Sequence, residues 1–171
     1  YAAHGSCLDL INNTGKGIAE EHIAVILREV LLGLDYLHKQ NKIHRDIKAA
    51  NLLLTEEGAV KIADFGATGQ LTDSVSKRQT HIGSPLWMAP EVVQGDAYDS
   101  MVDVWSLGIT AIELATKHAP LHDLEPMRAL MIIGSSRDHA PTLPQSDESG
   151  TSFSPDFHKF VEQCLRRNPA E

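Results

Sequence analysis

The segment His44-Arg45-Asp46-Ile47-Lys48-Ala49-Ala50-Asn51 decides how this 171-residue chain is interpreted. It brings together a carboxylate, an amine and an amide in a short stretch of the chain. Each has a plain structural explanation when taken alone: Asp46 as a turn residue, Lys48 as a solvated surface charge and Asn51 as a cap. The meaning of the segment therefore depends on the elements and motifs around it.

Helical periodicity precedes the segment. Residues 19–40 are predicted to form a long amphipathic helix, because their apolar positions recur at steps of three and four. A shorter helix is predicted near residues 6–13, ended by the Gly-containing stretch 14–17. The apolar positions of the long helix are Ile23, Ile26, Leu27, Val30, Leu31, Leu34 and Leu37.

A small hairpin is predicted directly after the segment. Residues 51–54 and 60–62 are short apolar runs, and the turn between them ends in Gly58. Residues 64–91 show no sustained period and are expected to form a long loop. Loops of that length in a compact domain are usually functional or disordered.

The second half of the chain is mostly helical. Residues 100–117 are apolar around their whole circumference, which predicts a helix buried on all sides. Ser100 and Asp103 have the spacing of an N-terminal cap. A short helix is expected near residues 126–133, followed by a polar surface loop over 134–152. The last helix is expected to start at Ser154 and to end near residue 168.

Two tripeptides complete the pattern. Asp64-Phe65-Gly66 follows the hairpin, and Ala89-Pro90-Glu91 closes the long loop. Either could arise by chance, but this order of motifs and elements resembles the catalytic half of a protein kinase. The run Asp103-Val104-Trp105-Ser106-Leu107-Gly108-Ile109-Thr110-Ala111-Ile112-Glu113-Leu114 is similar to the germinal-centre and Hippo-type branch of the sterile-twenty Ser/Thr kinases.

The resemblance implies a catalytic role for four residues. Phosphoryl transfer depends mainly on positioning and charge neutralisation. Asp46 is expected to orient the acceptor hydroxyl and accept its proton, and Lys48 to offset charge on the transferred group. Asn51 and Asp64 are expected to hold Mg²⁺. Lys48, two positions after Asp46, is typical of kinases that phosphorylate Ser and Thr.

The resemblance also implies contacts with ATP and a regulatory site. In addition to Lys48, Asn51 and Asp64, the residues expected on the nucleotide are Tyr1, Ala2, Ser6, Ala50 and Leu53. Thr80 resembles an activation-loop site, phosphorylated by an upstream kinase or by autophosphorylation and then bound by Arg45. The Ser84 hydroxyl is expected to touch the catalytic Asp and Lys, and Asp103 to anchor the backbone around Arg45.

Composition excludes several partners and compartments. The chain has 15 basic and 23 acidic side chains, a formal net charge of −8, which disfavours nucleic acid as a partner. No apolar run approaches the length of about 20 residues that a membrane span requires. Two cysteines, without a C-x-x-C spacing, favour a reducing, cytoplasmic setting.

The predicted fold class is therefore α+β and mainly α-helical: a kinase-like carboxy-terminal lobe with a small hairpin. Residues 1–171 are expected to run from the hinge through the penultimate helices of a partial kinase domain, truncated at both ends, with the small N-terminal lobe absent. Such a piece is expected to bind ATP weakly and to transfer no phosphate by itself. A non-catalytic, pseudokinase-like scaffold module is the alternative; the presence of Asp46, Lys48, Asn51 and Asp64 favours the enzyme.

Overall fold

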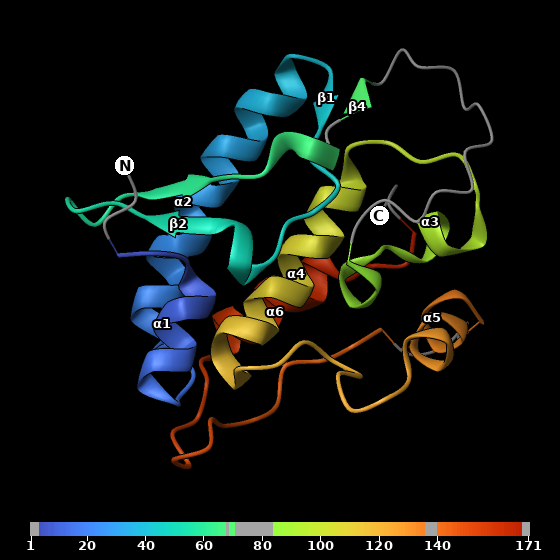
Figure 1. Ribbon diagram of the computed structural model, residues 1–171. Helices are drawn as coiled ribbons and strands as arrows, with labels where there is room; N and C mark the ends of the chain where they lie inside the picture. The colour runs from blue at the N-terminus through green and yellow to red at the C-terminus, as the bar shows by residue number, and fades with distance from the viewer. Residues whose placement is uncertain (1–3, 68, 71–83, 136–139, 169–171) are drawn as a thin grey trace.

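The structure is a computed structural model that describes residues 4–67, 69–70, 84–135 and 140–168. These residues form a helix-rich fold with two small antiparallel sheets, in agreement with the expected mainly helical class (Figure 1). The helices are α1 Cys7–Thr14, α2 Glu20–Lys39, α3 Pro90–Gln94, α4 Met101–Thr116, α5 Pro126–Ser135 and α6 Pro155–Cys164, with short 3-10 turns η1 Ala49–Asn51, η2 Phe65–Ala67 and η3 Pro85–Trp87. The strands are β1 Lys42–Ile43, β2 Leu52–Leu54, β3 Val60–Ile62 and β4 Gly69–Gln70.

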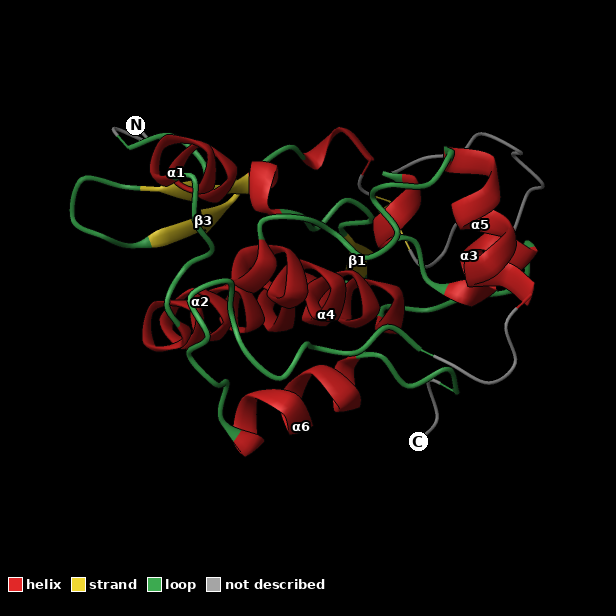
Figure 2. Ribbon diagram, turned by 90° about the horizontal axis from the view of Figure 1, so that it is seen from below, coloured by secondary structure: helices red, strands yellow, loops and turns green. Residues whose placement is uncertain are grey.

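Helix α4 is the centre of the packing. It contacts α1, α2 and α6, and Figure 2 shows α6 running along one side of it. Nearly all of its side chains are buried, as its apolar circumference predicts. Gly108 allows α6 to approach closely, because a Cβ there would lie 2.7 Å from the Cβ of Cys164.

Helices α1 and α2 begin and end where the sequence indicates. Ser6 and Asp9 form a capping box: the Ser6 hydroxyl accepts from the Asp9 N–H, and the Asp9 carboxylate accepts from the Ser6 N–H. Gly15 ends α1 in the left-handed conformation, which glycine adopts without a steric penalty. Helix α2 is tied to α6 because Glu20 accepts hydrogen bonds from the N–H and hydroxyl of Ser154, the N-cap of α6.

The hairpin forms as predicted. Strand β2 pairs with β3 in the register Leu52 to Ile62, and the positive φ of Gly58 closes the turn. The expectation of one long loop over 64–91 was wrong for its described parts. They contain η2, β4, η3 and α3. Strand β4 pairs with β1, and β1 was not predicted from the sequence either. Such short elements have no periodicity to detect, because pairing with distant residues creates them.

Helix α4 begins directly after Ser100 as predicted, but the predicted capping bond of Ser100 was wrong, and so was the predicted end of α6. Ser100 itself has helical backbone angles and its side chain makes no capping bond; Asp99 accepts from the Met101 N–H instead, at 2.8 Å. Helix α6 ends at Cys164 rather than near residue 168. The chain beyond it turns so that Arg167 donates to the carbonyl of Ile133 on α5. Among the described residues, no helix combines the length and apolar character needed to cross a membrane.

Candidate active site

The segment 44–51 is held by a buried carboxylate of α4. Asp103 is fully buried and accepts hydrogen bonds from the backbone N–H groups of His44 at 2.9 Å and Arg45 at 2.8 Å. Its Oδ2 also lies 2.8 Å from Nε2 of His38 on α2. Arg45 has a φ of 72°, a conformation that L-residues rarely adopt, so these bonds stabilise a strained turn. The expected anchoring role of Asp103 is confirmed.

Asp46 lies at the centre of a network of donors. Lys48 Nζ is 2.8 Å from Oδ2, Asn51 Nδ2 donates to the same oxygen at 2.9 Å, and the Ser84 hydroxyl donates to Oδ1 at 3.0 Å. Lys48 also donates to the Ser84 hydroxyl at 2.7 Å. Burial opposes ionisation of Asp46, but the bonds and charge of Lys48, with Ser84 and Asn51, outweigh it and lower its pKa. Asp46 is therefore a carboxylate at neutral pH.

Asn51 and Asp64 offer oxygen atoms suited to a hard cation. Asn51 uses Nδ2 for both its bonds to Asp46, one to the backbone carbonyl at 2.7 Å, which leaves its amide oxygen for a ligand. The Asp64 carboxylate is exposed and accepts only a local bond from the Gly66 N–H among those found in the described residues. Mg²⁺ is typically bound by one or two protein oxygens together with substrate phosphates. The two side chains fit that donor set.

Backbone and ring contacts connect Asp64 to the Asp46 segment. The Ala63 N–H donates to the Asn51 carbonyl at 2.9 Å, and His44 Nε2 lies 3.1 Å from the Ala63 carbonyl. The His44 ring also packs edge-on against Phe65, with centroids 5.2 Å apart. His44 and Asn51, which lie before and after Asp46 in the chain, are thus held against Ala63, the residue before Asp64.

A polar face on α4, defined here by Asp103, Ser106, Thr110 and Glu113, extends this support. Thr110 donates to the Ile47 carbonyl at 3.2 Å, and Ser106 donates to the Trp87 carbonyl at 2.8 Å. Glu113 accepts from the Ala49 N–H at 2.9 Å. The sequence analysis missed the last three residues. Their signal was the spacing of three, four and three in an otherwise apolar helix, which places them on one side.

The residues expected on the nucleotide lie along β2 and its neighbours. Ser6 and Leu53 face each other in an isolated antiparallel bridge, and Ala50 is in η1 beside Asn51. The Ser6 hydroxyl donates a hydrogen bond to the Asp9 carboxylate at 2.7 Å. Tyr1 and Ala2 lie outside the described residues. The ribose and adenine contacts stay predictions.

The regulatory residues are only partly described. The Arg45 guanidinium lies over the Tyr98 ring, 5.6 Å from its centroid, and its buried Nε has no hydrogen-bond partner within the part of the chain that the structure describes. Ser84 contacts Asp46 and Lys48 as the resemblance implied. Thr80 lies outside the described residues, so its pairing with Arg45 stays a prediction.

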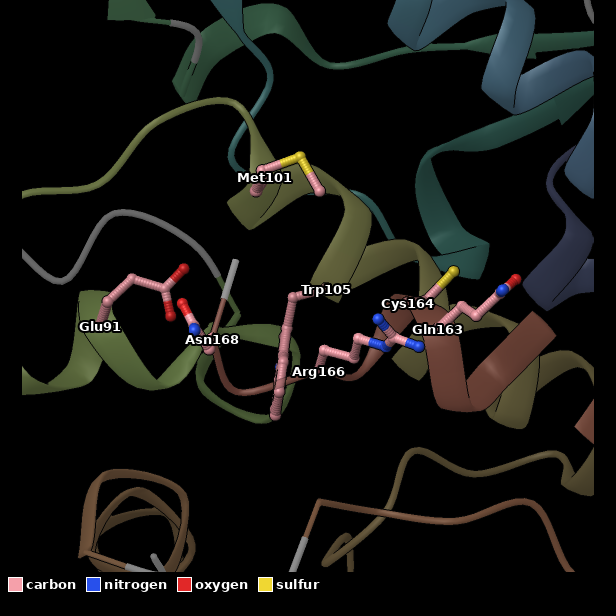
Figure 3. A pocket seen from close by; sticks show the side chains of 7 residues that line it. All are labelled: Glu91, Met101, Trp105, Gln163, Cys164, Arg166 and Asn168. Atoms are coloured by element: carbon pink, nitrogen blue, oxygen red, sulfur yellow. The ribbon is translucent and has the colours of Figure 1, made fainter. Parts of the chain in front are cut away.

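A cavity of about 230 Å³ adjoins the end of the long loop (Figure 3). Glu91 lies on its rim, and its carboxylate points toward Asn168. Burial, reinforced by the charges of Asp99 and Asp96, raises the pKa of Glu91. The lining residues are Glu91, Met101, Trp105, Gln163, Cys164, Arg166 and Asn168.

Comparison with known proteins agrees with this geometry. The sequence model of the protein kinase domain matches residues 1–171. Serine/threonine-protein kinase cst-1 of Caenorhabditis elegans is 46% identical over 171 residues, all of this chain and 33% of that protein. Serine/threonine-protein kinase 4 homolog A of Dictyostelium discoideum is 47% identical over 169 residues, 99% of this chain and 36% of that protein.

The chain thus spans about one third of the length of these curated relatives. The relatives confirm the resemblance to sterile-twenty Ser/Thr kinases that the motifs indicated. Together with the anchored Asp46 segment and the match along the whole chain, they show that this chain belongs to the protein kinase family.

Proposed function

We propose that this chain is the carboxy-terminal catalytic lobe of a Ser/Thr protein kinase that uses ATP and Mg²⁺. The observation that carries the proposal is the Asp46 carboxylate, which receives hydrogen bonds from Ser84 and Asn51 and an ion pair from Lys48. A carboxylate oriented in this way can accept a hydrogen bond from a substrate hydroxyl. The family resemblance favours Ser and Thr side chains of proteins as acceptors.

Each residue has a role that its surroundings support. Because the pKa of Asp46 is lowered, it is a weak base, and orienting the hydroxyl is its main contribution. The hydroxyl proton passes to an Asp46 oxygen as the acceptor oxygen bonds to the γ-phosphorus and the bond from that phosphorus to the leaving ADP oxygen breaks. Lys48, 2.8 Å from Asp46, can also place its charge near the transferred group. Asn51 and Asp64 would hold Mg²⁺, which neutralises phosphate charge when bound.

The test is phosphotransfer from ATP to protein substrates by the complete protein. We expect Asp46→Asn to lower the rate by about 10²- to 10⁴-fold, the usual contribution of a positioned acid or base. Asp123→Asn, which changes an exposed carboxylate to an amide, is the matched control and should leave the rate unchanged. Phosphoamino acid analysis should find phosphoserine and phosphothreonine.

The scaffold hypothesis predicts a different outcome. Under that hypothesis, the complete protein would show no phosphotransfer above the Asp46→Asn background while its fold was retained. A cytoplasmic setting also stays a proposal; it is supported by Cys7 and Cys164, which are both buried free thiols.

A further inference from the structure

Glu113 is a buried carboxylate that the proposed mechanism does not use. It is 4% exposed and lies on the polar face of α4, in a helix whose other buried side chains are mostly apolar. One of its oxygens, Oε2, accepts two hydrogen bonds, from the Ala49 N–H at 2.9 Å and from Trp87 Nε1–H at 3.1 Å. A buried acid that joins two separate segments requires a physical explanation.

The two donors lead back to the same catalytic carboxylate. Ala49 follows Lys48, whose amine is 2.8 Å from Asp46. On the other side, the backbone N–H of Trp87 donates to the Ser84 carbonyl at 3.0 Å, and the Ser84 hydroxyl donates to Asp46 at 3.0 Å. Glu113 is thus connected to Asp46 along two arms, that is, two series of contacts. One arm runs through Ala49 and Lys48, and the other runs through Trp87 and Ser84.

The strength of this junction depends on the charge of Glu113. Hydrogen bonds to a carboxylate are about twice as strong as those to a neutral acid. Burial raises the pKa of Glu113, and the bonds from Ala49 and Trp87 and the charge of Lys48 limit the rise to about 7. Among the described residues, Cys7 on α1 also faces Glu113; burial, reinforced by the charge of Glu113, raises the pKa of the Cys7 thiol to about 12, so it stays neutral.

We propose that ionised Glu113 is a positioning residue that fixes Lys48 and Ser84 on either side of Asp46 by holding Ala49 and Trp87 through a single oxygen. This inference rests on the proposed kinase function. Protonation of Glu113 weakens both bonds at once, and the two arms then hold Asp46 less precisely. The consequence is a loss of turnover on the acid side of neutrality, at a pH where Asp46 itself remains ionised.

The first experiment measures kcat of the complete protein between pH 5.5 and 8.5 at saturating ATP. In the wild type, kcat should rise about fivefold with a midpoint near pH 7, whereas Glu113→Gln should keep the low value throughout. Glu125→Gln, which changes an exposed acid, should retain the wild-type profile. A wild-type pH profile in Glu113→Gln would overturn the proposal.

A second variant changes the donor and leaves the acid in place. The hydrogen bond from the Trp87 indole N–H lowers the pKa of Glu113. Trp87→Phe keeps an aromatic ring but removes this N–H, so the pKa of Glu113 should rise. We therefore expect the midpoint of the kcat profile to move to higher pH. The Ser106 hydroxyl still holds the backbone carbonyl of residue 87, which favours a folded variant. An unchanged midpoint in a folded Trp87→Phe variant would contradict the proposed junction.

A third readout is independent of catalysis. Residues 1–171 contain two tryptophans, Trp87 and Trp105, and the indole N–H resonance of Trp87 is the one that disappears in Trp87→Phe. The Trp87 resonance should titrate near pH 7 in the wild type and stay fixed in Glu113→Gln. If this titration is found while the complete protein transfers no phosphate, the junction stands and the kinase proposal fails. A Trp87 resonance that does not titrate refutes the junction itself.

Discussion

The carboxylate of Asp103 lies 2.8 Å from the backbone nitrogen of Arg45, a residue 58 positions earlier in the chain. This bond stabilises a left-handed turn at Arg45 and so fixes where the next residue, Asp46, begins. Helix α4 therefore does more than fill the core, because its polar face determines the backbone path of the catalytic segment.

Replacing Asp103 should destabilise the fold. Asp103→Ala leaves two buried backbone N–H groups and His38 without their acceptor, so we expect the free energy of unfolding to fall by about 3 kcal/mol. Urea unfolding followed by circular dichroism measures the change. Asp35→Asn, which removes an exposed ion pair with Lys39, should change stability by less than about 0.5 kcal/mol. Equal effects of the two substitutions would contradict the anchoring role.

The hydroxyl of residue 84 should matter more than its exact side chain. Ser84→Ala removes the group shared by Asp46 and Lys48, and a bond to a charged group contributes about 1.5–3 kcal/mol, so kcat should fall at least tenfold. Ser84→Thr retains the hydroxyl and should remain close to wild type. Steady-state phosphotransfer by the complete protein measures both. An alanine variant as active as the threonine variant would show that the hydroxyl is dispensable.

Stability should depend on pH through Glu113. Its pKa is about 7 in the folded chain against an ordinary value of 4.5, so the folded state binds more protons between these values. The free energy of unfolding should therefore decrease as pH rises from about 4.5 to about 7, by on the order of 3 kcal/mol from this group. Glu113→Gln should lack this decrease. A wild-type minus Gln difference that is constant over this range would contradict the assignment.

The close approach of α4 and α6 should not tolerate a methyl group. In Gly108→Ala the new Cβ would meet the Cβ of Cys164 at 2.7 Å, and a Cβ cannot rotate away, so a helix must shift. We expect a loss of about 1–3 kcal/mol. In Gly134→Ala, also in a helix, the nearest contact of the new Cβ is a Val93 methyl at 3.0 Å and the others are ordinary van der Waals contacts, so the change should be nearly neutral. Thermal unfolding compares the pair, and similar melting temperatures would show that α4 and α6 have room to adjust.

The sequence by itself determined the elements that rely on local order. The apolar repeats of α2 and the apolar circumference of α4 predicted both helices, because periodicity and burial follow directly from side-chain spacing. The motif order was sufficient to identify the kinase resemblance, since the chemistry needs Asp46, Lys48, Asn51 and Asp64 in that arrangement. The capping box at Ser6 and Asp9 is also local, yet its use of the Ser6 hydroxyl became visible only in the structure.

Only the tertiary structure decided which distant groups serve the catalytic segment. The cap spacing of Ser100 and Asp103 suggested a local role, but Asp103 binds His44 and Arg45 instead. Glu113 is 64 positions from Ala49, and no local pattern specifies that contact. A hydrogen bond depends on the distance between two atoms, and distances between remote residues are set when α4 packs beneath the segment. The sequence therefore showed which polar residues α4 contains, whereas folding determined which groups Asp103 and Glu113 bind.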